Sequence, residues 1–399
     1  MTCHQEERTP LSDFAEIKHG FPFQSEFFGN SGDYLLLTPG NFNEAGGFRD
    51  LGETQKRYSG SVPPSFILDD GDVLVAMTEQ SPGLLGSTIK IPKGNTYLHN
   101  QRLGLVTIKR PECIYKGYLY HLFNAPHVRK EIWAGASGTK VKHTSPTKLC
   151  SIAVFLPLLT EQKLASSILD EWDNAIEKNE QLIAAKERHY THQLSRIISQ
   201  GQHPHSHVGK LAHEVSGRNR GGNEARLLSV TNSRGFVLPE DQFERRVASA
   251  DLSNYKVVTR GQYAYNPSRI NVGSIARLDD WELGVLSPMY VVFGLDETKV
   301  NSDYFLHWLD SHEARERIKN SAQGSVRETV SFTEFAAIVF PLPELTKQAA
   351  IARYLNALRD EISTLGVYVE KLKEQKRGLM QKLLTGQWRV LMENNEVAA

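Results

Sequence analysis

The sequence has few cysteines, no long hydrophobic run and no excess of either charge. Its three cysteines, Cys3, Cys113 and Cys150, form no Cys-x-x-Cys pair. That pattern argues against a disulfide framework or a cysteine-rich zinc site, and it fits a reducing cytosol. The longest apolar stretch, around Ile152 to Leu159, is too short to span a bilayer, and the polar N-terminus carries no secretory signal. We therefore expect a cytoplasmic protein.

The charges of the chain balance. Lysine plus arginine and aspartate plus glutamate each number 46, so the formal net charge is zero. No long segment is strongly basic, whereas proteins that bind nucleic acids usually carry a basic patch or stripe. If this chain binds DNA, its cationic side chains must gather on one face, or partner subunits must supply the positive charge.

Sequence motifs of common catalytic and metal sites are also missing. The chain contains no GxxxxGK[ST] phosphate loop, no GxGxxG after a strand and no HExxH. Several histidines gather in or near residues 201–209, but no carboxylate or cysteine is placed to complete a metal site with them. We therefore interpret 201–209 as a solvated linker and expect no metal. The histidines concerned are His189, His192, His203, His205 and His207.

The clearest feature that is present is an internal repeat. FLPLLTEQ (Phe155 to Gln162) and FPLPELTKQ (Phe340 to Gln348) each precede a helix-like stretch, which ends at Gly201 in the first copy and Gly386 in the second. The two glutamines give the offset, 348 − 162 = 186 residues. A repeat this long indicates a duplicated domain plus helix rather than a small solenoid unit.

The repeat divides the chain into globular and helical parts. We expect globular domain 1 at 1–156, helical region 1 at 157–201, globular domain 2 at 202–342, helical region 2 at 343–390 and a tail at 391–399. Each globular half shows short strands between turn residues, plus one helix, which predicts a mixed α/β (α+β) domain. The expected strands are 73–77, 103–108, 152–156, 284–286, 290–293 and 337–340, and the expected helices lie near 116–133 and 302–318.

Both helical regions carry apolar residues at the alternating three–four spacing of a coiled coil. Thr160 and Thr346 are expected as N-caps. A helix of about 38 residues is roughly 55 Å long, and the linker 201–209 is too short to bring the chain back. We therefore expect antiparallel helices with a domain at each end, in a pseudo-two-fold internal repeat. The expected seam residues are Trp172, Ile176, Ile183, Tyr190, Leu355, Leu358, Ile362, Leu365, Val369, Leu372, Leu379 and Leu383.

One short segment is similar to a catalytic motif. Tyr265-Asn266-Pro267-Ser268 resembles the Asn-Pro-Pro-Tyr box of adenine methyltransferases, but it lacks the second proline. Its counterpart in the repeat, Ala76-Met77, could not be catalytic. We interpret the segment as a turn at the end of a strand. A duplicated chain with no catalytic constellation in either copy points to recognition rather than catalysis.

The C-terminal residues carry a family resemblance that extends over essentially the whole chain. KRGLMQKLLTGQWRV (Lys376 to Val390), preceded by PLPELTKQAAIARYL (Pro341 to Leu355), is similar to the specificity subunit of type I restriction–modification enzymes. The Lys-x-x-Leu-Met-Gln-x-Leu-Leu-Thr-Gly ending and the repeated Leu-x-Pro…Gln helix start are highly specific together. The departures are small: Ser199-Gln200-Gly201 replaces Leu-Thr-Gly in the first copy, and Thr346-Lys347-Gln348 lacks the usual acidic residue.

The resemblance implies a DNA-specificity subunit that is not catalytic by itself. Proteins similar to this one bind a bipartite double-stranded DNA target, in which each domain reads one half and the helical pair sets the spacer. They recruit two methyltransferase (modification) subunits that use S-adenosylmethionine, and two motor–nuclease (restriction) subunits that use ATP and Mg, in phage defence. No cofactor is expected in this chain. An alternative is a specificity subunit of a methylation-only or phage-defence complex without a nuclease partner.

Loops that recur in both halves are the candidate DNA contacts, because function concentrates on loops held by a scaffold. Arginine and lysine suit guanine and phosphates, and asparagine and glutamine suit adenine. Three pairs of loops match in the repeat: 138–143 with 324–327, 78–81 with 266–271, and 18–24 with 218–226.

The candidates divide into positioning and reading residues. Phosphate contacts position a protein on DNA without specifying sequence, and that role is expected for Lys140, Lys142, Arg218, Arg220 and Arg327. The full set of candidates is Lys18, Gln24, Gln80, Ser81, Thr139, Lys140, Lys142, His143, Arg218, Asn219, Arg220, Arg226, Asn266, Arg269, Asn271, Ser325 and Arg327.

Two other classes of function compete with this hypothesis. A self-contained methyltransferase or nuclease would need a cofactor motif, and methyl transfer by the purified chain alone would support it. A structural coiled-coil adaptor with carbohydrate- or protein-binding ends would need no DNA. Salt-dependent binding to one bipartite DNA sequence separates that adaptor from a specificity subunit.

Overall fold

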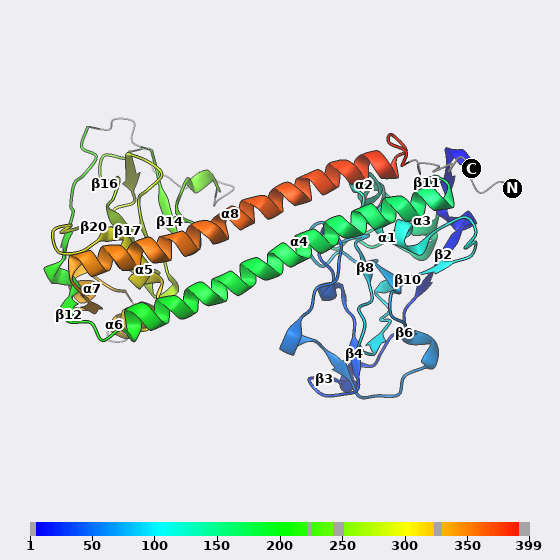
Figure 1. Ribbon diagram of the computed structural model, residues 1–399, viewed down its shortest axis with the longest axis horizontal. Helices are drawn as coiled ribbons and strands as arrows, with labels where there is room; N and C mark the ends of the chain where they lie inside the picture. Colours follow the sequence, from blue (N-terminus) through cyan, green and yellow to red (C-terminus); the bar gives the residue numbers. More distant parts are fainter. Residues whose placement is uncertain (1–4, 222–225, 242–250, 323–328, 391–399) are drawn as a thin grey trace, which may run out of the picture. The chain divides into compact units, whose positions relative to one another are not determined.

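The computed structural model of the protein describes residues 5–221, 226–241, 251–322 and 329–390. Contacts divide the chain into two compact units (Figure 1). Unit 1 combines residues 1–179 with 368–399, and unit 2 is the continuous segment 180–367. The division falls inside both long helices, so the predicted boundaries between each domain and its helix stay predictions. No helix in the described part of the chain is long and apolar enough to cross a membrane.

Unit 1 is built on an antiparallel four-stranded sheet with the order β2-β10-β7-β8. A separate antiparallel pair joins β1 to β11, and a five-stranded sheet has the order β3-β5-β4-β9-β6. The strands are β1 (Gln5–Pro10), β2 (Ala15–His19), β3 (Phe28–Gly29), β4 (Tyr34–Leu36), β5 (Arg57–Tyr58), β6 (Ile67–Leu68), β7 (Val73–Ala76), β8 (Thr88–Lys90), β9 (Tyr97–Leu98), β10 (Leu103–Ile108) and β11 (Ala153–Leu156).

Unit 2 repeats the central sheet of unit 1. Its four-stranded antiparallel sheet has the order β13-β20-β17-β18, and β12 pairs with β21 as β1 pairs with β11. Two further pairs join β14 to β15 and β16 to β19. The strands are β12 (His205–His207), β13 (Ala212–Glu214), β14 (Ser229–Thr231), β15 (Gly235–Val237), β16 (Lys256–Thr259), β17 (Tyr263–Tyr265), β18 (Ile275–Arg277), β19 (Leu283–Leu286), β20 (Val291–Leu295) and β21 (Val339–Pro341).

The short helices also match between the units. Unit 1 has α1 (Lys116–Asn124), α2 (Pro126–Ala134) and α3 (Pro146–Cys150). Unit 2 has α5 (Ser302–Asp310), α6 (His312–Ala322) and α7 (Phe332–Ala336). The starts of α1 and α5 differ by 302 − 116 = 186, the offset of the sequence repeat. The matching sheets and helices confirm the internal repeat and the mixed α/β class.

The prediction of one helix in each half was wrong, because both helices are interrupted. Ala125 adopts an extended backbone conformation between α1 and α2, and Pro126, which has no backbone N–H, starts the second helix. In unit 2, Ser311 is extended, and its hydroxyl accepts the Ala314 N–H at 3.1 Å as a helix cap. Ala125 and Ser311 are equivalent positions of the repeat, so the helix is interrupted at the same point in both units for two different local reasons.

Two long helices follow the domains: α4 (Leu159–Leu194), which continues into a π-turn at Ser195–Ser199, and α8 (Leu345–Leu384). Both begin one residue before the threonine predicted as N-cap, so Thr160 and Thr346 lie inside the first turn. Gly386 follows α8 with a φ of 76°, a left-handed conformation that suits glycine after a helix.

The helices are antiparallel (Figure 1). In unit 1, an ion pair joins Asp173 of α4 to Lys376 of α8. In unit 2, Lys186 Nζ of α4 lies 2.6 Å from Glu361 Oε1 of α8. Within unit 2, Arg359 of α8 also lies 5.7 Å from the centre of the Tyr190 ring of α4, so residue numbers rise along α4 as their partners' numbers fall along α8. Every predicted seam residue is buried or half-buried.

Each domain core extends onto the helices of its own unit. In unit 1, Leu169 of α4 and Leu384 of α8 belong to the same apolar cluster as Phe14 and Tyr118. In unit 2, Leu355 of α8 belongs to the cluster that contains Trp308. These side chains are almost completely buried, so each domain is packed on the helix pair as firmly as the core of a single domain.

Candidate nucleic-acid interface

Two of the predicted DNA-contact loops come together in unit 1. Thr78, just after β7, forms an antiparallel bridge with His143, and its hydroxyl lies 3.3 Å from His143 Nδ1. The Glu79 N–H donates to the Lys142 carbonyl at 2.9 Å, and the Thr144 N–H donates to the Met77 carbonyl at 3.0 Å. Loops 78–81 and 138–143 therefore form one surface.

The second of these loops is a tight hairpin that depends on one glycine. The Ser137 N–H donates to the His143 carbonyl at 2.9 Å, and the His143 N–H donates back at 2.8 Å. Gly138 has a φ of 103°, and a Cβ there would lie 2.2 Å from the Val141 carbonyl oxygen. Thr139 and Lys140 are exposed at the tip of this hairpin.

An exposed tryptophan that the sequence analysis missed lies beside the hairpin. Trp133, in the last turn of α2, is 52% exposed, and Lys142 Nζ lies 5.0 Å from the centre of its ring. Lys148 donates to the Gly135 carbonyl at 2.9 Å and to the Ser137 hydroxyl at 2.7 Å, and so holds the base of the hairpin. The local sequence does not show that Trp133 is exposed, because the apolar residue next to it, Ile132, is buried.

The topology of the sheet brings the third predicted loop to the same edge. Gly104 of β10 pairs with His19 of β2 on one side and with Val75 of β7 on the other. Strands β2 and β7 therefore run in the same direction and end at one edge, which we call the loop edge. Lys18 lies at this end of β2, and the exposed Gln24 lies in the loop that follows. Thr78 follows β7.

Unit 2 has a loop edge of the same construction. Phe293 of β20 pairs with Glu214 of β13 and with Tyr263 of β17, so β13 and β17 also end together. The predicted loops 218–226 and 266–271 follow these two strands. The Val330 N–H donates to the Pro267 carbonyl at 3.0 Å, which ties the segment before α7 to the second loop. Ser325 and Arg327 lie outside the described residues.

The loop after β17 is a turn at the end of a strand. Asn266 Oδ1 accepts the Ser268 N–H at 3.0 Å, and the Asn266 carbonyl accepts the Arg269 N–H at 2.9 Å. Tyr265 is fully buried. Arg269 is exposed and Asn271 is half-buried, so these two side chains remain available to a ligand.

The candidates in loop 218–226 separate into two groups. Arg218 donates to the Asn254 carbonyl at 2.6 Å, and Asn219 donates to the Leu252 carbonyl at 3.4 Å. These two side chains support the loop. Arg220 is exposed, and the exposed Arg226 stacks its guanidinium 5.5 Å from the centre of the Trp281 ring. In unit 1, Gln80 is exposed, and Ser81 donates to Glu44 Oε1 at 3.2 Å.

The histidine-rich linker is mostly exposed, as predicted, but it is not a plain loop, because part of it forms a strand. His205 and His207 lie in β12, which pairs with β21, and His203 is buried with its Nε2 2.8 Å from the Ile197 carbonyl oxygen. His207 Nδ1 lies 2.9 Å from the Ala337 carbonyl oxygen. His203 and His207 thus contact backbone carbonyl groups near the start of domain 2.

A cluster with the residue types of a metal site lies elsewhere in the described residues of unit 1. It consists of His121, Asp170 and Asp173. Lys90 Nζ lies 2.5 Å from Asp170 Oδ1, and Lys376 forms an ion pair with Asp173. The two ammonium groups already neutralise both carboxylates, so the arrangement is that of an ion-pair network.

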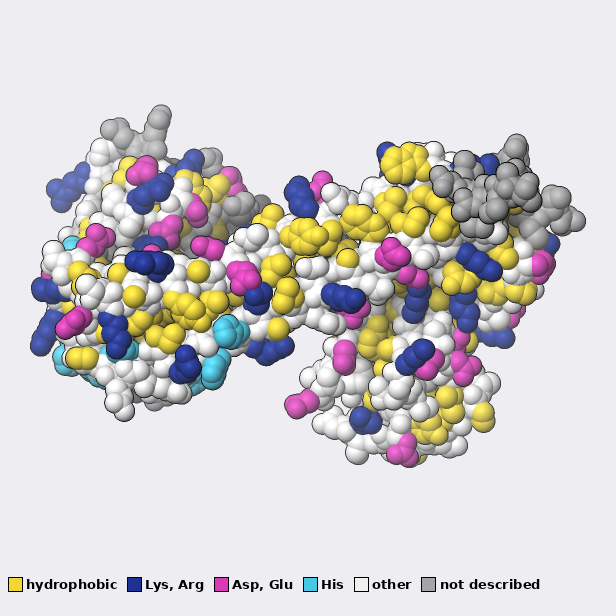
Figure 2. Space-filling model, viewed as in Figure 1, with side chains coloured by type: hydrophobic (Ala, Val, Ile, Leu, Met, Phe, Trp, Pro, Cys, Tyr) yellow, Lys and Arg dark blue, Asp and Glu magenta, His cyan; other side chains and the backbone are white. Residues whose placement is uncertain are grey.

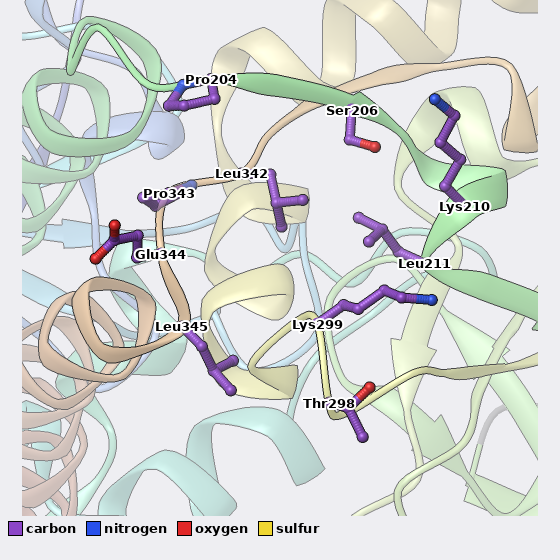
Figure 3. Close-up of a pocket in the computed structure, with 10 residues that line it drawn as sticks. All are labelled: Pro204, Ser206, Lys210, Leu211, Thr298, Lys299, Leu342, Pro343, Glu344 and Leu345. Carbon is purple, nitrogen blue, oxygen red and sulfur yellow. The ribbon is translucent and has the colours of Figure 1, made fainter.

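An open pocket of about 760 Å³ lies at the start of α8 in unit 2 (Figure 3). Its apolar lining includes Leu211 and Leu342, and Glu344 is directed away from Lys210 and Lys299. Lys299 Nζ pairs with Asp296 Oδ2 at 2.7 Å. The polar groups of this pocket do not converge on one point, so it lacks the construction of a small-molecule site.

Charge is mixed on the face of the protein seen in Figure 2, where lysine and arginine side chains are scattered among acidic ones. No single basic stripe is visible on this face.

Comparison with known proteins gives several matches. Residues 6–187 match the family model described as "Type I restriction modification DNA specificity domain". The type I restriction enzyme EcoBI specificity subunit of Escherichia coli is 23% identical over 431 aligned residues, which cover 96% of this chain and 87% of that protein. Residues 6–187 are therefore similar to the type I restriction–modification specificity domain. A putative MjaX specificity subunit of Methanocaldococcus jannaschii is 22% identical and covers 80% of this chain and 79% of its own length.

Solved structures of type I specificity subunits share the fold. The crystal structure of the S subunit from M. genitalium superposes with a TM-score of 0.59 at 13% identity and covers 96% of this chain and 98% of that one. A chain from another type I restriction–modification system gives a TM-score of 0.55 at 13% identity. The chain thus shares the overall fold of these solved structures.

Proposed function

We propose that each domain of this specificity subunit reads one half of a bipartite DNA target and that α4 and α8 set the spacer between the halves. The observation that carries the proposal is the repeated loop edge. In each unit, the loops after two same-direction strands leave one edge of the sheet and carry exposed cationic and amide side chains, such as Lys140 and Arg269. Such side chains suit guanine, adenine and phosphates.

The long helices support the spacer role. A helix of 36 residues, such as α4, is about 54 Å long. Half-sites on one face of B-DNA lie about one turn, roughly 34 Å, apart. A helix pair of this length is long enough to span that separation.

The specificity subunit would act within a complex. We propose that the helical regions dock two methyltransferase subunits, which use S-adenosylmethionine to methylate adenine, and two motor–nuclease subunits, which use ATP and Mg. An enzyme that modifies a base must take it out of the stack into a pocket. That pocket would belong to the methyltransferase subunit.

Mapping adenine methylation in cells with and without the gene tests the proposal. The expected result is one methylated motif, present only with the gene, that consists of two short defined segments separated by a spacer of constant length. A continuous motif without a spacer, or methylation that does not depend on the gene, would contradict it.

Replacing Lys140 by alanine is expected to weaken DNA binding by about three- to tenfold, through the loss of one phosphate contact. Since a phosphate contact is independent of sequence, the loss should be similar for the mapped target and for unrelated DNA. The slope of log affinity against log salt should become shallower by about 0.9. Fluorescence anisotropy of the assembled methyltransferase at several salt concentrations measures both effects.

The matched control is Lys93→Ala. Lys93 is exposed and follows β8, which runs opposite to β7, so it lies at the other edge of the same sheet. Its removal should leave affinity and salt slope unchanged. Equal losses in both variants would show that the loop edge is not the DNA-facing edge.

A further inference from the structure

A buried histidine lies between the domain and the long helices in each unit. His121 is on α1 in unit 1, and His307 is on α5 in unit 2. Both are completely buried, and they are equivalent in the repeat, since 307 − 121 = 186. Neither belongs to a loop edge, and the proposed reading of DNA does not explain either of them.

His121 is held by an ionic network that joins four elements. Its Nε2 lies 2.8 Å from Asp170 Oδ1, and its Nδ1 lies 3.9 Å from Asp173 Oδ2, both on α4. Asp170 also pairs with Lys90 of β8, and Asp173 pairs with Lys376 of α8. We call these five residues the unit 1 joint. It connects domain 1 to both long helices.

His307 occupies the equivalent position in unit 2, where mainly neutral hydrogen bonds hold it. Its Nε2 lies 2.8 Å from Asn356 Oδ1 of α8, and its Nδ1 lies 2.8 Å from the Tyr190 hydroxyl of α4. Asn356 also donates to Asp303 Oδ2 of α5 at 2.9 Å. Arg359 of α8 lies 5.7 Å from the centre of the Tyr190 ring. These five residues are the unit 2 joint.

The two joints occupy equivalent positions of the repeat but are built from different side chains. At the repeat offset of 186, Asp170 corresponds to Asn356, and Tyr190 corresponds to Lys376. Unit 2 thus places an amide and a phenol where unit 1 places a carboxylate and an ammonium group. The Nε2 contact of the histidine is 2.8 Å long in both units although its partner has changed, whereas Nδ1 is hydrogen-bonded to Tyr190 in unit 2 and has no hydrogen-bond partner among the described residues of unit 1. The Nε2 contact to the long helix is therefore the common requirement.

We propose that His121 and His307 are positioning residues, each of which fixes the orientation of its own domain on the helix pair and thereby the placement of its loop edge on DNA. The proposal rests on the proposed function. Apolar contacts alone permit small rotations, whereas the hydrogen bond from each buried histidine to a long helix is directional and restricts them. Loss of these hydrogen bonds would leave the domain folded but would let its orientation on the helix pair vary. Base discrimination depends on that orientation, because it places the loop edge on the DNA.

The joints also carry a pH dependence. Burial lowers the pKa of His121, while Asp170 and Asp173 oppose that effect and Lys376 adds to it. Lys90 faces the same group through Asp170. Burial alone would raise the pKa of Asp170, but its hydrogen bonds from His121 and Lys90 lower it.

In unit 2, burial likewise lowers the pKa of His307. The hydrogen bond to Asn356 opposes that effect, Arg359 adds to it, and Asp310 and Asp303 oppose it. Tyr190 also faces His307. A histidine with a lowered pKa favours its uncharged form in the joint. Both joints should therefore stabilise the orientation of their domains most at pH values above the ordinary histidine pKa of about 6.5. That stabilisation should decrease as the pH falls below this value.

The test uses the full chain assembled with its methyltransferase subunits and the target found by methylation mapping. Discrimination is measured as the ratio of affinities for that target and for a target with one base pair changed in one half-site. His121→Gln should reduce this ratio about tenfold at one half-site only, and His307→Gln should do so at the other half-site only, as expected for loss of a buried hydrogen bond. Each variant should also lose the fall in discrimination below about pH 6.5 at its own half-site, because glutamine does not titrate.

Three further variants separate positioning from general destabilisation. Asp170→Asn supplies the acceptor that Asn356 supplies in unit 2 and should retain discrimination within about threefold, whereas Asp170→Ala should lose it. His192→Gln changes an exposed histidine of α4 and should change neither half-site. Equal losses at both half-sites from either buried variant, or no loss from both, would overturn the proposal. If the wild-type complex discriminates at neither half-site, the proposed function fails instead.

Discussion

Replacing Gln162 by leucine is expected to lower the free energy of unfolding by about 3 kcal/mol or more. This side chain is completely buried at the start of α4. Its Nε2 donates to the carbonyl oxygens of Cys113 at 2.8 Å and Pro157 at 2.9 Å, and its Oε1 accepts the Tyr115 N–H at 2.9 Å. Leucine has a similar volume but would leave these backbone groups without their side-chain partner, at about 1–3 kcal/mol for each.

Gln348 predicts an equal effect in unit 2. Its Nε2 donates to the carbonyl oxygens of Pro343 at 2.8 Å and Lys299 at 3.1 Å, and its Oε1 accepts the Asn301 N–H at 2.8 Å. The same three bonds join the same elements at an offset of 186 residues. Gln348→Leu should therefore destabilise unit 2 as Gln162→Leu destabilises unit 1.

Urea denaturation followed by tryptophan fluorescence measures both effects. The matched control is Gln375→Leu, because Gln375 is an exposed glutamine on α8 and its replacement should change stability by less than about 0.5 kcal/mol. If the Gln162→Leu variant were as stable as this control, the buried hydrogen bonds at the start of the helix would not be what holds the domain to its helix.

Inserting four helix-forming residues after Asn179 in α4 and four after Val367 in α8 is expected to abolish methylation of the natural target. Recognition should move to a target with unchanged half-sites and a longer spacer. Both insertion points lie at the division between the units, so Asp173 keeps Lys376 and Lys186 keeps Glu361 as partners. Four residues add about 6 Å and slightly more than one helical turn, which corresponds to about two base pairs.

The loss at the natural target should be about a hundredfold or more, because a domain out of register forfeits several base contacts worth about 1–3 kcal/mol each. Methylation mapping with each insertion variant gives the new motif. As a control, insertion into α4 alone should disrupt the antiparallel register and yield an inactive protein. New half-site sequences with the old spacer would refute the idea that the helices measure the target.

The sequence predicted the architecture well because several independent sequence features reflect the internal repeat. The Gln162 and Gln348 motifs, the three–four spacing of the seams and the short linker each gave one independent constraint, and the antiparallel pair follows from them together. The ends of strands were also approximately predictable, since turn residues interrupt them: β10 spans Leu103–Ile108, as expected.

Other features could not be predicted, because they depend on residues far apart in the chain. The loop edge exists only once β10 lies between β2 and β7, and strand order leaves no mark on local sequence. The roles of Arg218 and Asn219 as loop supports depend on carbonyl groups more than 30 residues away. His121 has no local signature either, since its partners are on other elements.

The discontinuous build of unit 1 has a consequence for synthesis on the ribosome. Residues 1–179 emerge first, but their core is completed by Met380, Leu383 and Leu384, which emerge last. Unit 2 is one continuous segment that can fold as soon as it is made. The domain translated first should thus mature last, and until α8 arrives it would expose the apolar surface that α8 covers. A chaperone that shields such surface would be needed most in this interval.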